Sequence, residues 1–327
     1  MYKSKLTIRQ TQEAIQDLRH IFQEHLKKNL NLTRATAPLF VAPESGLNDG
    51  LNGESAVSFE AKMVNNKRLE VVHSLAKWKR NALKEYDYKV GEGIYTDMNA
   101  IRREEVLDET HSLYVDQWDW EKIITSDDRN INFLKEVVSL IYDAFKKTKR
   151  EMVERFSSLE NDLPEEVFFI SAQDLEDLYP ESSIDERENL ITQKHKVVFI
   201  KRIGYPLKSG LIHSTRAFDY DDWKLNGDLL VWSNTLKKAV EISSMGIRVD
   251  EKSLKEQSKM TEAQLKELSP YHKAIIDKNL PLTIGGGIGQ SRVCMLILEK
   301  AHIGEVQSSY WPEDYKKKLK AKGINLL

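Results

Sequence analysis

The sequence predicts an α+β protein, because amphipathic helices and paired strands both recur along its 327 residues. Apolar residues follow the helical period over 7–30 and again over 131–150, which predicts two long amphipathic helices. Short apolar or alternating segments separated by polar turns predict strands joined as hairpins. The two predicted strand pairs are 93–102 with 112–121, and 226–232 with 239–245.

The composition is that of an ordinary globular protein, with 40% hydrophobic and 31% charged residues. The net charge of −2 argues against nucleic acid as a partner, because nucleic-acid-binding domains usually carry a basic excess. The single cysteine, Cys294, excludes an intramolecular disulfide, and its apolar neighbours predict a buried side chain. The sequence has no run of 18 apolar residues and no signal-peptide pattern, so we expect a cytoplasmic protein without a membrane partner.

After the first helix, residues 32–38 predict a short strand that is stopped by Pro38. The segment 42–55 is rich in Gly, Asn and Ser and predicts a mobile loop. Asp49 lies in the middle of this loop, where composition alone indicates a turn residue rather than a catalytic one.

Residues 69–80 predict a strand that runs into a helix. Lys77, Lys79 and Arg80 crowd the start of that helix, where positive charge opposes the helix dipole. Judged from these residues alone, a solvated basic face is the favoured interpretation.

The first hairpin places polar side chains on one face of its second strand. Val115, Gln117 and Asp119 share one face, and Asp116, Trp118 and Trp120 share the other. On the first strand, alternation groups Arg102 with Thr96, Met98 and Ala100. An arginine, an amide and a carboxylate in one hairpin suit a polar site, but they equally suit the solvent side of a sheet.

In the second half of the chain, 167–170 and 196–200 predict buried strands on either side of a charged helical stretch. If the second hairpin turns between Asn234 and Thr235, Asp228 lies directly opposite Glu241. Like charges at opposed positions are unfavourable unless a divalent cation binds between them. Two exposed carboxylates without a metal remain the alternative.

The segment 282–298 contains four glycines, Gly285, Gly286, Gly287 and Gly289, ahead of an apolar helix. Arg292 falls in the first turn of that helix, where a cation is unfavourable unless an anion such as phosphate lies nearby. The segment is neither a Walker loop nor a dinucleotide-binding motif. A tight strand-to-helix turn with a surface arginine is the alternative.

Four blocks of the sequence resemble the ammonia-dependent asparagine synthetase (aspartate–ammonia ligase) family. They are EVVHSLAKWKR (70–80), YVDQWDW (114–120), SSMGIRV (243–249) and GGGIGQSR (285–292). The resemblance spans nearly the whole chain. It implies a mostly antiparallel sheet flanked by helices, like the catalytic domain of class II aminoacyl-tRNA synthetases, as a single domain over residues 1–327. It also implies a homodimer in which residues 7–38 form the dimer element.

The family reaction implied by this resemblance uses ATP, Mg²⁺, L-aspartate and ammonia. The β-carboxylate of aspartate attacks the α-phosphorus of ATP, and ammonia then displaces AMP from the β-aspartyl-AMP. The strands ending at Arg102 and beginning near Ser112 resemble class II motif 2, and the glycine segment with Arg292 resembles motif 3.

The resemblance also implies roles for single residues. Asp49 would orient ammonia or accept its proton, and the other residues implied in catalysis are Lys79, Arg102 and Gln117. The residues implied around aspartate are Ser74, Asp119, Asp221, Ser243, Ser244 and Arg248. Those implied around ATP are Arg102, Asp228, Glu241, Gly287, Gly289 and Arg292, with Asp228 and Glu241 also holding the metal.

Two other functions compete with this interpretation. A class II relative that activates an amino acid for tRNA would need an anticodon-binding domain, and no segment is left over for one. A catalytically inactive paralogue would be expected to lose its motif arginines, whereas Arg102 and Arg292 are both present. One departure from the family is the short connection between Trp223 and Asn226, which puts a contribution of that loop to site closure in doubt.

Overall fold

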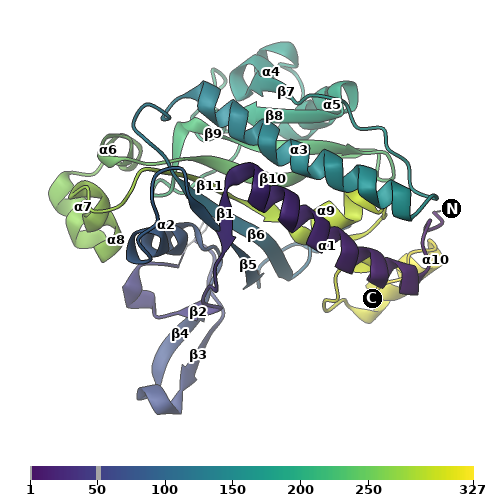
Figure 1. Cartoon of the computed structure of the whole chain (residues 1–327), viewed down its shortest axis with the longest axis horizontal. Coiled ribbons are helices and arrows are strands. Elements are labelled where there is room, and N and C mark those ends of the chain that lie inside the picture. Colours follow the sequence, from purple (N-terminus) through teal and green to yellow (C-terminus); the bar gives the residue numbers. More distant parts are fainter. Residues whose placement is uncertain (1, 49–52) are drawn as a thin grey trace.

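An eight-stranded sheet forms the centre of the molecule in the computed structural model, which describes residues 2–48 and 53–327 (Figure 1). In spatial order the strands are β1 (Leu32–Arg34), β5 (Gly93–Ile101), β6 (Tyr114–Ile123), β11 (Thr283–Gly289), β10 (Lys238–Arg248), β9 (Asp221–Ser233), β8 (Val197–Lys201) and β7 (Phe168–Ser171). The inner pairings, from β5 to β8, are antiparallel, but β1 pairs parallel with β5 and β7 parallel with β8. The α+β prediction is therefore confirmed. The sheet itself is mixed, because both of its edges are parallel.

Three helices cover one face of this sheet: α1 (Ile8–Leu30), α3 (Ile131–Arg155) and α9 (Gln290–Ile297). Figure 1 shows α1 and α3 running side by side across the strands. Thr7 begins α1 with a capping box, which satisfies free amide groups of the first turn. Trp118 of β6 is fully buried beneath them and stacks on Phe22 at 4.4 Å between ring centroids. This face is the main hydrophobic core.

The opposite face of the sheet is covered only in part. Helices α4 (Ala172–Leu178) and α5 (Ile184–His195) pack on its β7–β8 side, where Ile200 and Leu230 lie in a second apolar cluster. Helix α2 (Ala76–Glu85) packs near β5 and β6. The remaining helices are α6 (Glu251–Ser258), α7 (Glu262–Leu268), α8 (Pro270–Ile276) and α10 (Glu313–Ala321). Between α2 and α5, this face of the sheet presents polar residues.

A small second sheet projects from the body of the molecule (Figure 1). Its strands are β2 (Phe40–Val41), β4 (Lys67–Val71) and β3 (Ser58–Ala61), and short 3-10 turns lie at η1 (Pro43–Ser45), η2 (Lys62–Val64) and η3 (Ile303–Glu305). Part of the predicted loop 42–55 therefore connects β2 to β3.

The predicted helices agree closely with the structure, whereas one strand and one turn do not. Helix α1 begins one residue after the predicted start, and α3 continues five residues past the predicted end. The first strand is shorter than predicted and ends at Arg34, well before Pro38. The glycine segment is a strand, not a tight turn, and residues 285–289 do not adopt positive φ. Residues 223–226 lie inside β9, so this connection is continuous strand.

Within the described residues, no helix has the length and apolar character needed to cross a membrane.

Candidate active site

The sheet register brings one row of residues from five adjacent strands onto the partly open face. Across β5, β6, β11, β10 and β9, the row consists of Thr96, Asp119, Gly287, Ser244 and Asp228. Directly opposed residues point to the same side of an antiparallel sheet. Residues distant in sequence therefore meet above the sheet, and the polar face predicted for β6 is part of this floor.

Two pockets adjoin above this row. The central pocket has a volume of about 270 Å³, and its walls include Ser74, Asp119, Arg216, Asp221, Ser244 and Arg248. The side pocket, about 180 Å³, is lined among others by Thr110, His111, Gly289, Arg292 and Ile303. The residues common to both walls, which we call the junction, are Arg102, Gln117, Glu241 and Gly287. The structure thus brings most of the sequence-predicted site residues together.

In the central pocket, cationic side chains are neutralised by buried carboxylates. The guanidinium of Arg248 donates to both oxygens of Glu121, at 2.9 Å from Nε and 2.7 Å from Nη2, and Nη1 donates to Asp221. All three side chains are buried. Burial alone would lower the pKa of Arg248, but the charges of Glu121 and Asp221 outweigh it and raise that pKa. This network fixes Arg248 and Asp221 in one arrangement.

Lys79 lies beneath the pocket floor and holds Asp119. Its fully buried ammonium pairs with the Asp119 carboxylate and donates to the carbonyl of Trp120 at 2.9 Å. Burial lowers the pKa of Lys79, although Asp119 and Glu121 act in the opposite direction. In this arrangement Lys79 orients Asp119. Lys77 and Arg80 are also buried, so the solvated basic face expected here was wrong.

The basic residues of α2 are buried because carboxylate and carbonyl groups surround that helix. Lys77 Nζ lies 2.6 Å from Asp219 Oδ2, and Arg80 donates to the carbonyls of Pro281 and Val249 at 2.9 and 2.8 Å. Buried charges persist only where such partners exist, and the sequence of α2 does not show those partners.

Arg216 was not predicted from the sequence, although it lines the central pocket. Its Nη2 donates to Asp221 at 2.9 Å, while its buried Nε has no hydrogen-bond partner among the described residues. A buried donor left unpaired favours a ligand that accepts from it. The residue lies in an irregular segment before β9, where no periodicity distinguishes it. The feature of the sequence that could have indicated Arg216 is its position five residues before Asp221.

In the side pocket, by contrast, neutral groups hold the arginine. Arg292 Nη1 donates to the carbonyl of Glu241 at 3.0 Å, and Nη2 lies 2.9 Å from His111 Nε2. The nearest carboxylate oxygen in an ion pair with Arg292 is that of Glu241, at 3.8 Å. Arg292 occupies the first turn of α9, as predicted. Its positive charge remains largely available to an anion.

The start of α9 is stabilised from outside the helix. Asp116 is buried, and its carboxylate accepts from the backbone amide of Ser291 at 3.1 Å and from the Ser291 hydroxyl at 2.8 Å. A carboxylate at a helix N-terminus interacts favourably with the helix dipole. It partly offsets the unfavourable placement of Arg292.

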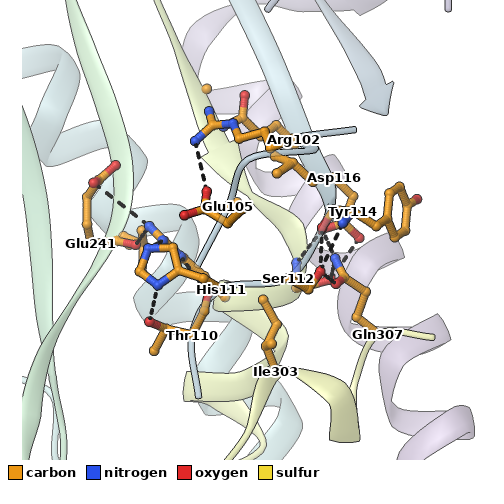
Figure 2. A pocket seen from close by; sticks show the side chains of 17 residues that line it. Arg102, Glu105, Thr110, His111, Ser112, Tyr114, Asp116, Glu241, Ile303 and Gln307 are labelled. Carbon is orange, nitrogen blue, oxygen red and sulfur yellow. Dashed lines mark hydrogen bonds and ion pairs between the residues drawn. The ribbon is translucent and has the colours of Figure 1, made fainter. Parts of the chain in front are cut away.

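Arg102 lies at the junction, at the end of the strand where it was predicted (Figure 2). Its nearest ionic partner is Glu105, 3.8 Å away, and its buried Nε has no hydrogen-bond partner among the described residues. Gln117, also at the junction, leans over Gly287, because a Cβ on Gly287 would lie 2.4 Å from Gln117 Oε1. Cationic and amide donors therefore meet where the pockets join.

Asp228 and Glu241 are close, but the predicted register was wrong. The hairpin places Glu241 opposite Leu230, and Asp228 opposite Ser244, whose hydroxyl donates to Asp228 at 2.5 Å. Leu230 and Asp228 are two residues apart on one strand, so Glu241 still lies on the same face as Asp228. Burial raises the pKa of Asp228 to about 7, and the charge of Glu241 adds to this effect.

A β-bulge at Ile242 explains why Glu241 and Ser244 share a face although they are three residues apart. The register shifts between Glu241 and Ser243, and both Glu241 and Ser244 line the central pocket. A bulge inserts one unpaired residue and so reverses the alternation beyond it.

The glycines of β11 allow neighbouring side chains to cross this strand. A Cβ on Gly285 would lie 2.0 Å from Glu121 Oε2, and one on Gly286 would lie 2.5 Å from the Cβ of Met245. The role of these glycines is therefore to allow close approach of other groups to the backbone.

Three predicted residues that the structure describes, Lys79, Asp228 and Ser243, line neither of the two pockets. Ser243 pairs with Leu229 and Ile288 of the hydrophobic core and donates to the carbonyl of Gly287 at 2.9 Å. The bulge at Ile242 places it on the core face. Asp49 lies outside the described residues.

Comparisons with known proteins identify the family of this chain. Residues 9–323 match the family model of aspartate-ammonia ligase. An aspartate–ammonia ligase of Clostridium tetani is 53% identical over 327 residues, covering 100% of this chain and 96% of the relative. One from Bacillus mycoides is 53% identical over the full length of both chains.

Solved structures of similar fold are class II aminoacyl-tRNA synthetases. Asparaginyl-tRNA synthetase from Pyrococcus horikoshii, complexed with asparaginyl-adenylate, has a TM-score of 0.67 at 16% identity and covers 93% of this chain and 70% of that chain. The Entamoeba histolytica enzyme in complex with asparaginyl-adenylate has a TM-score of 0.66 at 14% identity, with coverage of 93% and 68%. At such identities the likeness concerns the fold. The family match and the full-length relatives place this chain in the aspartate–ammonia ligase family.

Proposed function

We propose that this chain makes asparagine through a β-aspartyl-AMP intermediate, with aspartate in the central pocket and ATP in the side pocket. The observation that carries this assignment is the junction between the two pockets. In the central pocket, the charges of arginines and carboxylates balance, whereas in the adjoining side pocket Arg292 has no carboxylate of the described residues within hydrogen-bond distance. A reaction between an amino acid and a nucleotide requires two adjoining sites of this kind.

In the first step, a β-carboxylate oxygen of aspartate forms a bond to the α-phosphorus of ATP. The bond from the α-phosphorus to the bridging oxygen breaks, and pyrophosphate leaves. Arg102 and Gln117 line both pockets, so they are the groups available to the reacting carboxylate and phosphate. Arg292 stabilises phosphate charge from the side pocket. Phosphoryl transfer depends mainly on such positioning and charge stabilisation.

In the second step, ammonia attacks the acyl carbon, the bond to the AMP oxygen breaks, and the new amide loses a proton. The central pocket suits aspartate because it presents both signs of charge. Asp119 and Asp221 accept hydrogen bonds from the substrate ammonium, and the unpaired Nε of Arg216 donates to a substrate carboxylate. The asparaginyl-adenylates bound by the two synthetases of similar fold support an acyl-adenylate intermediate.

Glu241 at the junction and Asp228 beside it also fit Mg²⁺. Burial and the charge of Glu241 together raise the pKa of Asp228, and a bound cation would stabilise both carboxylates in their charged form. Within residues 2–48 and 53–327, no cluster of three or more His, Cys, Asp or Glu side chains is arranged to hold a metal. Two carboxylates completed by phosphate oxygens and water is the usual Mg²⁺ arrangement. Bound there, the ion would neutralise phosphate charge.

The metal assignment predicts a change in Mg²⁺ dependence. Asp228→Asn and Glu241→Gln should each raise the Mg²⁺ concentration for half-maximal aspartate-dependent ATP–pyrophosphate exchange by about tenfold or more. The matched control is Glu188→Gln, because Glu188 also raises the pKa of Asp228 but pairs with His213 at 3.0 Å. Mg²⁺ curves that coincide with the control curve would show that the pair is structural.

Association into a homodimer through residues 7–38 is a further part of this proposal. Strand β1 is an edge strand of the main sheet in the described part of the chain. Further along the chain, Leu39 and Phe40 are 52% and 44% exposed, which suits a surface that a partner covers. The molar mass from light scattering tests the dimer, and a monomer at micromolar concentration would contradict it.

The experiment that tests the function is product analysis with aspartate, ATP, Mg²⁺ and ammonium. We expect AMP, pyrophosphate and asparagine in equal amounts. Without ammonium, we expect exchange of labelled pyrophosphate into ATP but no net asparagine. Formation of ADP, or a requirement for tRNA, would contradict the proposal.

A further inference from the structure

His111 contacts Arg292 in the side pocket, although the sequence predicted no role for His111. It lies in the segment between β5 and β6, beside Thr110 in the side pocket (Figure 2). Its Nε2 is 2.9 Å from Arg292 Nη2, and its Nδ1 is 2.9 Å from Asp108 Oδ1. The imidazole therefore bridges an acidic residue of this segment and the first turn of α9.

The partners of His111 determine which ring nitrogen carries the proton: Arg292 at Nε2, and at Nδ1 Asp108 together with the Thr110 hydroxyl at 3.1 Å. Arginine is always protonated and can only donate, so Nε2 must accept from Arg292. The proton is then on Nδ1, which donates to Asp108. Asp108 is well suited to accept it, since its carboxylate also receives the backbone amides of Thr110 and His111 at 2.7 and 2.8 Å. Burial disfavours the charged form of Asp108, but these hydrogen bonds and His111 outweigh burial and lower its pKa.

A neutral acceptor at this position has a specific consequence for Arg292. The Glu241 carbonyl at 3.0 Å fixes one terminal nitrogen and His111 fixes the other. Neither group carries a negative charge. The guanidinium is thus held in place without its charge being neutralised, in contrast to Arg248, which two carboxylates bind directly.

We propose that His111 is a positioning residue that holds Arg292 toward the phosphates of ATP by acting as a neutral hydrogen-bond acceptor. This inference rests on the proposed function, because it assumes that ATP occupies the side pocket. Its effect should appear in the use of ATP, and not in the use of aspartate, since Arg292 lines only the side pocket of the two pockets described here.

Two variants that differ by one methylene separate positioning from general disruption. In His111→Asn, the amide reaches the position of Nδ1 and can still donate to Asp108, but no acceptor remains for Arg292. In His111→Gln, the longer side chain can place its oxygen near the position of Nε2. We expect the KM for ATP in pyrophosphate exchange to rise about tenfold or more in His111→Asn, as for loss of a hydrogen bond to a charged group. His111→Gln should remain within about threefold of the unmodified protein, and the KM for aspartate should change less than twofold in both.

A double-mutant cycle tests whether the effect passes through Arg292. In an Arg292→Ala background, His111→Asn should change the residual exchange rate by less than about twofold, because the group that it positions is absent. Thermal unfolding of each variant reports whether the fold is retained.

Three results would overturn the inference. The first is equal KM values for ATP in the Asn and Gln variants, and the second is a parallel rise in the KM for aspartate. The third is that His111→Asn lowers the exchange rate as much in the Arg292→Ala background as it does in the unmodified protein. Failure of the proposed function is distinguishable, because the unmodified protein would then show no aspartate-dependent pyrophosphate exchange.

Discussion

The central pocket and the side pocket both contain arginines, but they hold them with opposite kinds of partner. In the central pocket, Arg248 is bound by Glu121 and Asp221, and Arg216 by Asp221. In the side pocket, backbone carbonyl groups and an imidazole bind Arg292. The first arrangement leaves little net charge, and the second leaves a positive charge available.

This difference corresponds to the charges of the two substrates. Aspartate carries one ammonium and two carboxylates, so a pocket with alternating charges can bind it without a large net field. The triphosphate of ATP carries only negative charge, which requires uncompensated cations. The contrast between neutralised and available arginines therefore supports the proposed assignment of aspartate to the central pocket and ATP to the side pocket.

The largest expected effect concerns the stability of the fold when Arg248, whose charge is neutralised, is replaced. Arg248→Met leaves Glu121 and Asp221 buried without their principal cation, which should lower the free energy of unfolding by about 3–5 kcal/mol. Arg292→Met is the matched control, and it should cost less than about 1 kcal/mol, because its hydrogen-bond partners are neutral and the Glu241 carboxylate, 3.8 Å away, is 42% exposed. Urea denaturation of both variants measures the difference. Equal losses would remove the distinction between the two pockets.

The available arginine should matter to the reaction and not to folding. Arg292→Ala should reduce pyrophosphate exchange by about 10²–10³-fold, in line with the loss of one donor to developing charge. Arg9→Ala is a control for removing an arginine, since Arg9 is 92% exposed and pairs only with Glu13 among the described residues. Near-normal exchange by a folded Arg292→Ala protein would refute the phosphate assignment.

A smaller effect concerns how the stability of the structure beside the side pocket depends on pH. His302 is fully buried beside the side pocket, where its Nδ1 accepts the amide of Gly304 at 3.0 Å and begins the turn that carries Ile303. Burial lowers the pKa of His302 to about 4 from its ordinary 6.5. The neutral form is therefore favoured by folding, and the resulting stability is present above pH 6.5 and lost as the pH falls toward 4.

Between pH 7 and pH 5, this linkage should lower the free energy of unfolding by about 2 kcal/mol. His302→Asn retains an acceptor near Nδ1 and does not titrate, so its stability should decline less over the same interval. The measurement is urea denaturation at both pH values. If the two proteins lose stability in parallel, His302 is not responsible.

The sequence predicted the elements that follow a regular period. Alternation along β6 correctly separated Trp118 and Trp120 from Gln117 and Asp119, because burial of one face requires that pattern. The family motifs also located Arg102 and Arg292 correctly. Arg102 directly follows β5 and Arg292 lies in the first turn of α9, so regular elements fix both positions. The α+β architecture followed from the same periodic signals.

What the sequence did not predict depends on contacts between distant segments. Lys77 and Arg80 appeared solvated, because their partners Asp219 and Val249 come from other parts of the chain. Arg216 and His111 lie in irregular segments, where no period indicates which side chain turns inward. The register of the second hairpin was missed because its turn is centred one residue later than assumed.

The bulge at Ile242 makes the site depend on how β10 pairs with β9 as well as on the identity of its residues. A strand sends odd and even positions to opposite faces, so one extra residue changes the parity of everything beyond it. If regular pairing replaced the bulge without a change in length, Glu241 and Ser244, which are three residues apart, would point to opposite faces. Their shared face therefore depends on the bulge, and not only on the identity of the two residues.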